Sequence, residues 1–133
     1  MSNSTEYISI QKDELSEYRY LEQLEDDFGE LHLHLSNKEC NGEIMIRFYN
    51  VLSYTSTYET ARSKMFYNNL NTIITKGVFS EVVNSPYAEW ISLQSESIYS
   101  ESDLRHFCIL TTEYVIDIIC GSSCEFPFTI EKS

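Results

Sequence analysis

Alternating hydrophobic and polar residues predict the strands of an antiparallel sheet. In the LHLHL motif the leucines take every second position, so His32 and His34 share the opposite face of the strand. The segment 41–52 repeats this alternation, and a turn that contains Asn-Gly joins the two segments. Two further segments, 104–110 and 114–120, carry the strongest strand signals, and we expect them to form a hairpin.

Two segments carry helix signals. Residues 56–77 are predicted to form a helix, because Ser56 and Glu59 match a capping box and four apolar residues follow on one stripe. A lysine and a glycine close this segment, as is typical of a helix end. The second segment begins with Ser85 before Pro86, a reasonable helix start, but it could equally be extended.

The remaining signals complete the expected fold class. Residues 17–24 fit either a strand or a short helix, and Pro127 restricts any strand near it to the edge of a sheet. The length of 133 residues is that of one domain, and a hydrophobic share of 42% argues against disorder. We therefore expect a single α+β domain over 1–133, with an antiparallel sheet of about five strands and one or two helices packed on one face.

The charge of the chain narrows the class of partner. Nine basic residues oppose 21 acidic ones, which gives a net charge of −12. Nucleic acids and anionic membrane surfaces would repel such a chain, so neither is an expected partner. Basic proteins remain as partners, although the same acidity would also serve solubility alone.

The acidity is concentrated at the N-terminal end. Residues 1–30 hold nine acids and two basic residues, a net charge of −7, in a region that could be partly flexible or simply solvated. Tyrosines lie beside the densest acidic run, and tyrosine is enriched in protein interfaces. The candidate partner-binding residues are Tyr18, Tyr20, Glu25, Asp26, Asp27 and Glu30. Ordinary packing of the two tyrosines under the sheet is the alternative.

The compartment is expected to be the cytoplasm. The first ten residues lack both the basic and the apolar region of a signal peptide, and no apolar run reaches the length of a membrane span. The chain has four cysteines, Cys40, Cys108, Cys120 and Cys124. Without an export signal we expect them to be reduced.

A metal site is the alternative use of the histidines. A His-x-His pair on one strand and a third histidine on a neighbouring strand can bind zinc. The candidate ligands are His32, His34, His106 and Cys108, which could converge only if their strands pair through the right faces. His106 and Cys108 fall on what looks like a second apolar face, so we expect the two sets to face away from each other and His32 and His34 to lie on a solvated face.

Catalysis is not expected from the motifs present. The four glycines are scattered, so the chain has neither a nucleophile elbow nor a phosphate-binding loop. Serines are frequent, but none lies beside a histidine and an acid in a recognisable order. We therefore predict that the protein is not an enzyme and needs no cofactor.

One stretch resembles known proteins. Residues 84–120 contain an NS…W…S segment and then L-[KR]-H-[FY]-x-I-x-T…I-D-[IV]. This pattern resembles small uncharacterised bacterial proteins, some of which are similar to immunity proteins of toxin–immunity systems. The resemblance implies a compact α+β protein that blocks a partner toxin, often a nuclease, without catalysis of its own, but it carries no defined site residues.

The sequence thus predicts a non-catalytic protein-binding module. It would act as an acidic inhibitor or immunity protein against a basic partner protein such as a toxin. The alternative is a metal- or small-ligand-binding domain that uses His32, His34 and His106. The sequence leaves the oligomeric state open.

Overall fold

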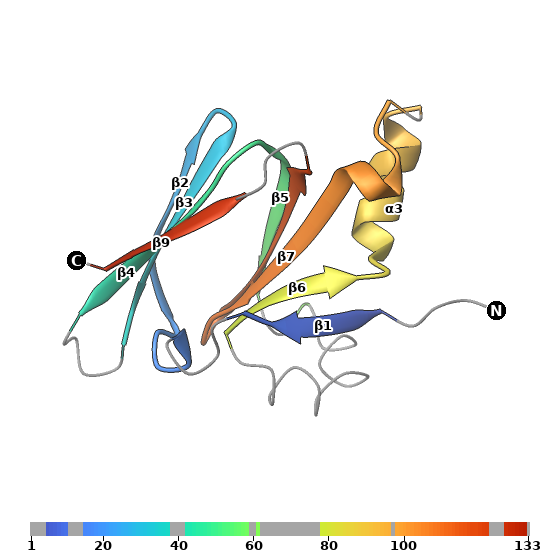
Figure 1. Ribbon diagram of the computed structural model, residues 1–133. Coiled ribbons are helices and arrows are strands. Elements are labelled where there is room, and N and C mark those ends of the chain that lie inside the picture. The colour runs from blue at the N-terminus through green and yellow to red at the C-terminus, as the bar shows by residue number, and fades with distance from the viewer. Residues whose placement is uncertain are drawn as a thin grey trace.

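Two antiparallel sheets dominate the computed structural model, which describes residues 5–10, 15–37, 42–58, 61, 78–96, 98–122 and 127–132 (Figure 1). A five-stranded sheet has the order β1-β6-β7-β8-β5, and a four-stranded sheet has the order β2-β3-β4-β9. The described strands are β1 Glu6–Ser9, β2 Tyr20–Asp27, β3 Glu30–Ser36, β4 Glu43–Phe48, β5 Val51–Tyr58, β6 Phe79–Val83, β7 Leu104–Leu110, β8 Tyr114–Gly121 and β9 Phe128–Lys132.

The α+β class is right in outline, but the expected single sheet of about five strands is wrong. The described residues form nine strands in two sheets, with one α-helix, α3 (Pro86–Gln94), and one turn of 3-10 helix, η2 (Glu101–Asp103). The segment 41–52, which was expected to be one strand, is divided between β4 and β5, and this division explains much of the difference between one sheet and two. Asn50 has a φ of 52°, so the chain turns after β4 and enters β5, which pairs with β8 in the other sheet. Asparagine tolerates this left-handed conformation better than most residues.

The predicted helix over 56–77 does not begin at Ser56. Ser56 lies in β5 and pairs with Ile116 of β8, so it is not a helix cap. The pairing with a buried neighbouring strand outweighs a local capping signal, because a cap contributes only about 1 kcal/mol. Thr57 and Tyr58 also lie in β5, and apart from Ala61 the remaining residues 59–77 lie outside the described part of the chain.

The main core lies between the two sheets. Leu31, Leu33 and Leu35 of β3 are fully buried there, as their alternation predicted. Across from them, Phe107 and Ile109 of β7 belong to the same hydrophobic cluster. Four aromatic rings, those of Phe48, Phe79, Phe107 and Phe128, meet in this core with centroids 4.9 to 6.1 Å apart. The buried faces of both sheets are thus the ones that the period-2 pattern indicated.

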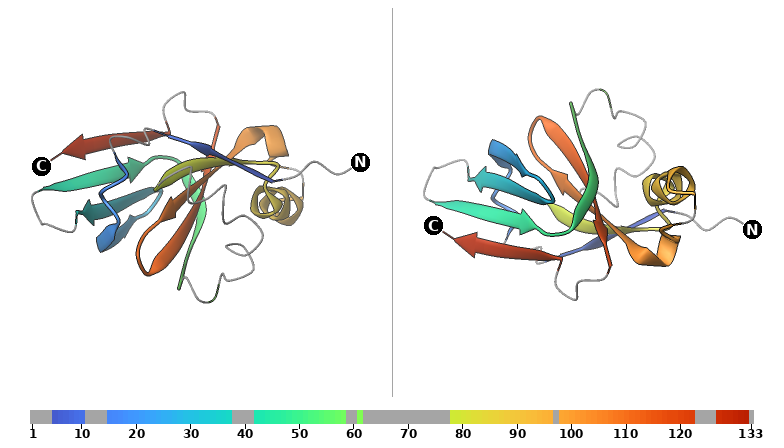
Figure 2. Two further views of the ribbon diagram at one scale, coloured as in Figure 1. Left: turned by 90° about the horizontal axis from the view of Figure 1, so that it is seen from below. Right: turned by 90° about the horizontal axis from the view of Figure 1, so that it is seen from above.

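Helix α3 lies on the outer side of the five-stranded sheet, away from the four-stranded sheet (Figure 2). Ala88 of the helix packs against Leu104 and Ile119 of β7 and β8. The predicted start is confirmed, because Ser85 is the N-cap and its hydroxyl oxygen accepts the Ala88 N–H at 3.0 Å. In the described part of the chain, no helix has both the length and the apolar character needed to cross a membrane.

Three other predictions can be compared with the sheets. The 104–110 and 114–120 segments form the β7–β8 hairpin, as expected. Of the ambiguous segment 17–24, residues 20–24 lie in strand β2, so they form the strand and not the short helix. The strand after Pro127 is β9, at the edge of the four-stranded sheet, where the missing N–H of proline is tolerated.

Candidate functional site

The outer face of the four-stranded sheet, opposite the core, carries most of the charge of that sheet. Its carboxylates come from Glu22, Glu25, Asp27, Glu30, Glu43 and Glu131, and its guanidinium comes from Arg47. We call this set, together with His32 and His34, the acidic face. Alternation places it there, because each of these strands turns its apolar residues toward the other sheet. Among the residues of this face that the structure describes, six carboxylates against one guanidinium give a strong negative potential.

The two histidines lie on this face, as the sequence predicted. The side chains of His32 and His34 are 15% and 21% exposed, so they are less solvated than a bare strand face would leave them. His34 lies between Glu25, at 2.6 Å, and Glu43, at 3.3 Å, while His32 contacts Glu30 at 3.1 Å. The His34 imidazole therefore bridges two carboxylates of the acidic face, and the His32 imidazole contacts a third.

The tip of the β2–β3 hairpin exposes an aromatic side chain. Phe28 is 99% exposed and has a φ of 42°, and the next residue, Gly29, has a φ of 101°. Two positive φ angles suit a two-residue hairpin turn, whose usual residues are Asn-Gly or Asp-Gly. A bulky phenylalanine in this conformation is a backbone outlier, and its ring makes no contribution to the core.

Asp26 holds this tip from the other side of the hairpin. Its Oδ1 accepts the Phe28 N–H at 3.2 Å, and its Oδ2 accepts the Tyr54 hydroxyl at 3.1 Å. Partial burial, and then the hydrogen bond to Asp26, raise the pKa of Tyr54. The hairpin tip is therefore tied to β5 of the neighbouring sheet by a carboxylate that the acidic face does not include.

The predicted partner-binding residues divide between two surroundings. Glu25, Asp27 and Glu30 lie on the acidic face, and Tyr20 pairs with Ser36 at one end of it. Tyr18 packs against the main core, and Asp26 supports the hairpin tip. The sequence reasoning missed Phe28, because only the glycine that follows it, between two alternating segments, is a signal for a turn.

A second cluster of polar side chains lies beneath helix α3. His106 and Asp117 are only 6% and 3% exposed, and His106 Nε2 lies 2.6 Å from Asp117 Oδ1. His106 Nδ1 lies 2.6 Å from the hydroxyl oxygen of Ser85, the helix N-cap. The ring of Tyr87 packs edge-to-face on His106 with centroids 5.5 Å apart. Three elements of the fold therefore meet in one Ser–His–Asp chain of hydrogen bonds.

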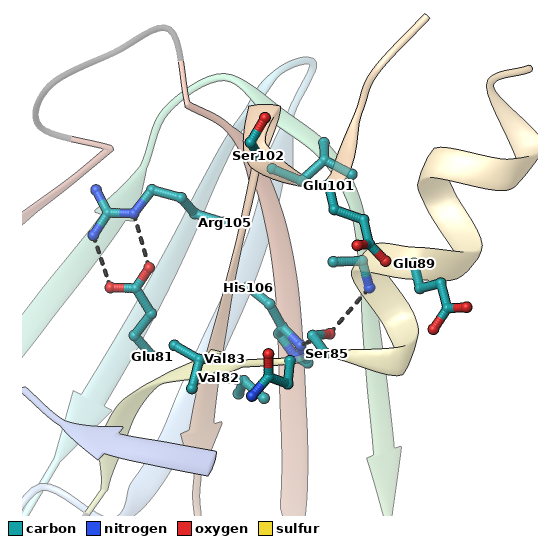
Figure 3. A pocket seen from close by; sticks show the side chains of 12 residues that line it. Glu81, Val82, Val83, Ser85, Glu89, Glu101, Ser102, Arg105 and His106 are labelled. Carbon is teal, nitrogen blue, oxygen red and sulfur yellow. Dashed lines mark hydrogen bonds and ion pairs between the residues drawn. The ribbon is translucent and has the colours of Figure 1, made fainter. Parts of the chain in front are cut away.

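A pocket of about 610 Å³ opens beside this chain (Figure 3). Ser85 and His106 line it, and Arg105 donates two hydrogen bonds to Glu81, at 2.9 and 2.8 Å, on one side. Hydrogen bonding to Glu81 raises the pKa of Arg105, which favours the charged guanidinium. The exposed carboxylates of Glu89 and Glu101 line the other side, away from that pair. With one neutralised pair and two further carboxylates, the pocket favours a positively charged ligand.

The candidate metal ligands do not come together. His32 and His34 belong to the acidic face, whereas His106 and Cys108 lie on the outer side of the five-stranded sheet, so the two sets face away from each other as expected. Among the residues that the structure describes, no three or more histidine, cysteine, aspartate or glutamate side chains are placed to hold a metal ion. Cys40 and Cys124 lie outside the described residues.

The Ser85–His106–Asp117 chain also escaped the sequence reasoning. Its members lie on three separate elements, and their order along the chain matches no motif. One signal was present, because Asp117 interrupts an otherwise apolar strand segment and a charge there needs a buried partner. Comparisons with protein-family models, with curated proteins and with solved structures found no match. The resemblance to immunity proteins therefore stays a prediction.

Proposed function

We propose that this protein is a binding module that docks a basic partner protein, such as a toxin, on its acidic face and on the adjoining hairpin tip. The observation that carries this proposal is the fully exposed Phe28 beside a face with six carboxylates and one guanidinium. Such a role requires no catalytic step. It suits a cytoplasmic inhibitor of the kind that the resemblance implies.

The acidic face supplies the long-range part of the interaction. Its negative potential would steer a basic surface toward it and raise the association rate, most strongly at low salt. Three of its six carboxylates, those of Glu25, Asp27 and Glu30, lie on β2 and β3 within three residues of Phe28. These carboxylates and Phe28 would therefore contact the same surface of the partner.

Phe28 supplies the short-range part. Aromatic side chains buried in a partner pocket are frequent interface hot spots, and a ring at a hairpin tip can enter such a pocket with little loss of side-chain freedom. A bulky residue with positive φ is unfavourable by about 1 kcal/mol or more, and asparagine would fit the turn better. A locally unfavourable residue with no packing role is typical of a functional position.

The test uses two matched double variants. Glu25→Lys with Asp27→Lys reverses two charges on the acidic face. Glu96→Lys with Glu113→Lys makes the same net change at exposed positions, one after helix α3 and one in the turn between β7 and β8. The partner is first captured with the tagged wild-type chain from its native host and then purified. We expect the acidic-face variant to slow association at least tenfold and to flatten its salt dependence, whereas the control stays within about twofold.

Protection in cells is the second measurement of the same test. A captured partner that is toxic when expressed alone should become harmless beside the wild-type chain and beside the control variant. The acidic-face variant and Phe28→Asn should protect less well, and Phe28→Asn should raise the dissociation rate. Equal effects of both double variants would mean that only net charge matters, and the proposed docking surface would be wrong.

A further inference from the structure

The second polar cluster has the geometry of an activated hydroxyl. An ionised Asp117 can only accept a hydrogen bond, so His106 donates its Nε2–H to it and leaves Nδ1 as an acceptor. The Ser85 hydroxyl then donates to Nδ1 at 2.6 Å. In the usual Ser–His–Asp arrangement, Nε2 accepts from the serine and Nδ1–H donates to the acid. Here the two nitrogens have the opposite roles, but one still accepts from the serine while the other donates to the acid, as general-base activation requires.

The surroundings of Ser85 add to this activation. Its oxygen accepts the Ala88 N–H at 3.0 Å at the start of the nine-residue helix α3, where the helix dipole favours negative charge. Ser85 and His106 also line the 610 Å³ pocket, so both residues border a space large enough for a small molecule. An N-cap alone requires neither the pocket nor a buried His–Asp pair, because a serine oxygen satisfies the helix by itself.

We propose that this pocket is an acyl-transfer site in which Ser85 is the nucleophile, His106 is the general base and Asp117 is a positioning residue. The substrate class is a small carboxylic ester whose acyl group carries a positive charge. This site lies on the five-stranded sheet, away from the acidic face, and goes beyond the proposed binding function. The exposed carboxylates of Glu89 and Glu101 would hold the cationic end of the substrate.

The reaction balances without a cofactor. The Ser85 oxygen forms a bond to the ester carbonyl carbon while its proton moves to His106 Nδ1. The bond to the leaving alcohol breaks, and the alcohol oxygen takes that proton. Water then attacks the acyl-serine, gives a proton through His106 back to the Ser85 oxygen, and releases the carboxylic acid. The Ala88 N–H already donates to the Ser85 oxygen, so the Tyr87 N–H, in the first turn of α3, would be the backbone donor for the oxyanion.

The first measurement is covalent labelling of the full chain with a fluorophosphonate, followed by peptide mass spectrometry. We expect one adduct, on Ser85. Ser85→Asn should abolish it while the chain stays folded, because asparagine is an equally good N-cap without a nucleophilic hydroxyl. His106→Gln should slow labelling at least 100-fold, in keeping with the usual contribution of a general base. Ser92→Ala, on the same helix, should label like the wild type, because the Ser92 hydroxyl donates to the Tyr99 carbonyl.

The second measurement tests the substrate class. Two p-nitrophenyl esters of equal length are compared, one ending in a trimethylammonium group and the other in the uncharged tert-butyl group of the same shape. We expect the cationic ester to react at least tenfold faster than the neutral one, and Glu89→Gln with Glu101→Gln to bring the ratio of the two rates close to one. An equal rate for both esters in the wild type would refute the cationic substrate class.

Two outcomes would overturn the site itself. If the folded wild-type chain takes no fluorophosphonate under conditions that label a known serine hydrolase, the hydrogen-bond chain serves only to cap and anchor α3. If Ser85→Asn keeps the label, the reactive group is another residue. Circular dichroism of each variant shows that the folded state is retained, so that a lost label reports the lost group.

Discussion

The buried pair of His106 and Asp117 makes a quantitative prediction about the stability of the fold. Asp117 lies in the centre of β8 and His106 lies in β7, and both are more than nine-tenths buried. We consider His106→Leu, Asp117→Val and the double variant. Leucine and valine suit a strand that is buried on this side, so the changes remove polarity with little loss of packing.

The expected magnitudes follow from burial. Removing one member of a buried polar pair leaves the other in a low-dielectric site and costs about 3 to 5 kcal/mol. Replacing both members by apolar side chains removes that penalty, so the double variant should lose less than about 1.5 kcal/mol. The two effects are therefore strongly non-additive, with a coupling of at least about 4 kcal/mol. The Ser85 hydroxyl, which is only partly buried, can turn to water in the double variant.

Urea denaturation followed by circular dichroism measures these losses. With a slope of about 2 kcal/mol per molar urea, each single change should lower the midpoint by about 2 M. The double variant should recover most of this shift. If the loss in the double variant equals the sum of the single losses within about 0.5 kcal/mol, the two side chains do not interact and the assignment of the pair is refuted.

Three further predictions address the faces of the sheets, the hairpin tip and the phenol of Tyr87. Leu33→Ala should lower the free energy of unfolding by about 3 kcal/mol and His34→Ala by less than about 1 kcal/mol, because only Leu33 is fully buried. Equal losses in urea denaturation would contradict the assignment of these two residues to opposite faces of β3. Phe28→Asn should raise this free energy by roughly 0.5 to 1 kcal/mol in the same assay, because the φ of 42° suits asparagine and no packing is lost; a clear loss would mean that the ring has a structural contact. Burial raises the pKa of Tyr87 above its ordinary value of 10.0, so the folded state keeps this proton when the unfolded chain loses it. The stability from this group is present below pH 10 and is lost as pH rises through the folded pKa, so Tyr87→Phe should lose less stability between about pH 9 and 11 than the wild type in a urea series.

The local elements were largely predictable from the sequence. The alternation around His32 placed that strand and its buried face correctly, and the β7–β8 hairpin followed from two apolar segments with a short connection. Ser85 before Pro86 marked the start of α3. In each case the signal and the structure depend on residues close together in the chain, so periodicity and capping suffice to find them.

The candidate sites were only partly predictable. The acidic run pointed to Glu25, Asp27 and Glu30, which do share a face, but strand alternation turned Asp26 to the other side. Phe28 was not predictable as a turn residue, because phenylalanine is unfavourable with positive φ and Gly29 alone is a weak turn signal.

What the sequence by itself determined is which residues of each strand face a core, because that property has a period of two and needs no knowledge of the partner strand. The tertiary structure alone decided to which sheet each strand belongs. The turn at Asn50 sends β5 to β8, so the expected single sheet becomes two. It also decided that Ser85, His106 and Asp117 meet, because they come from a loop and two strands whose pairing depends on long-range packing. Contacts of this kind do not produce a recognisable spacing along the sequence, so the Ser85–His106–Asp117 chain of hydrogen bonds could be identified only from the fold.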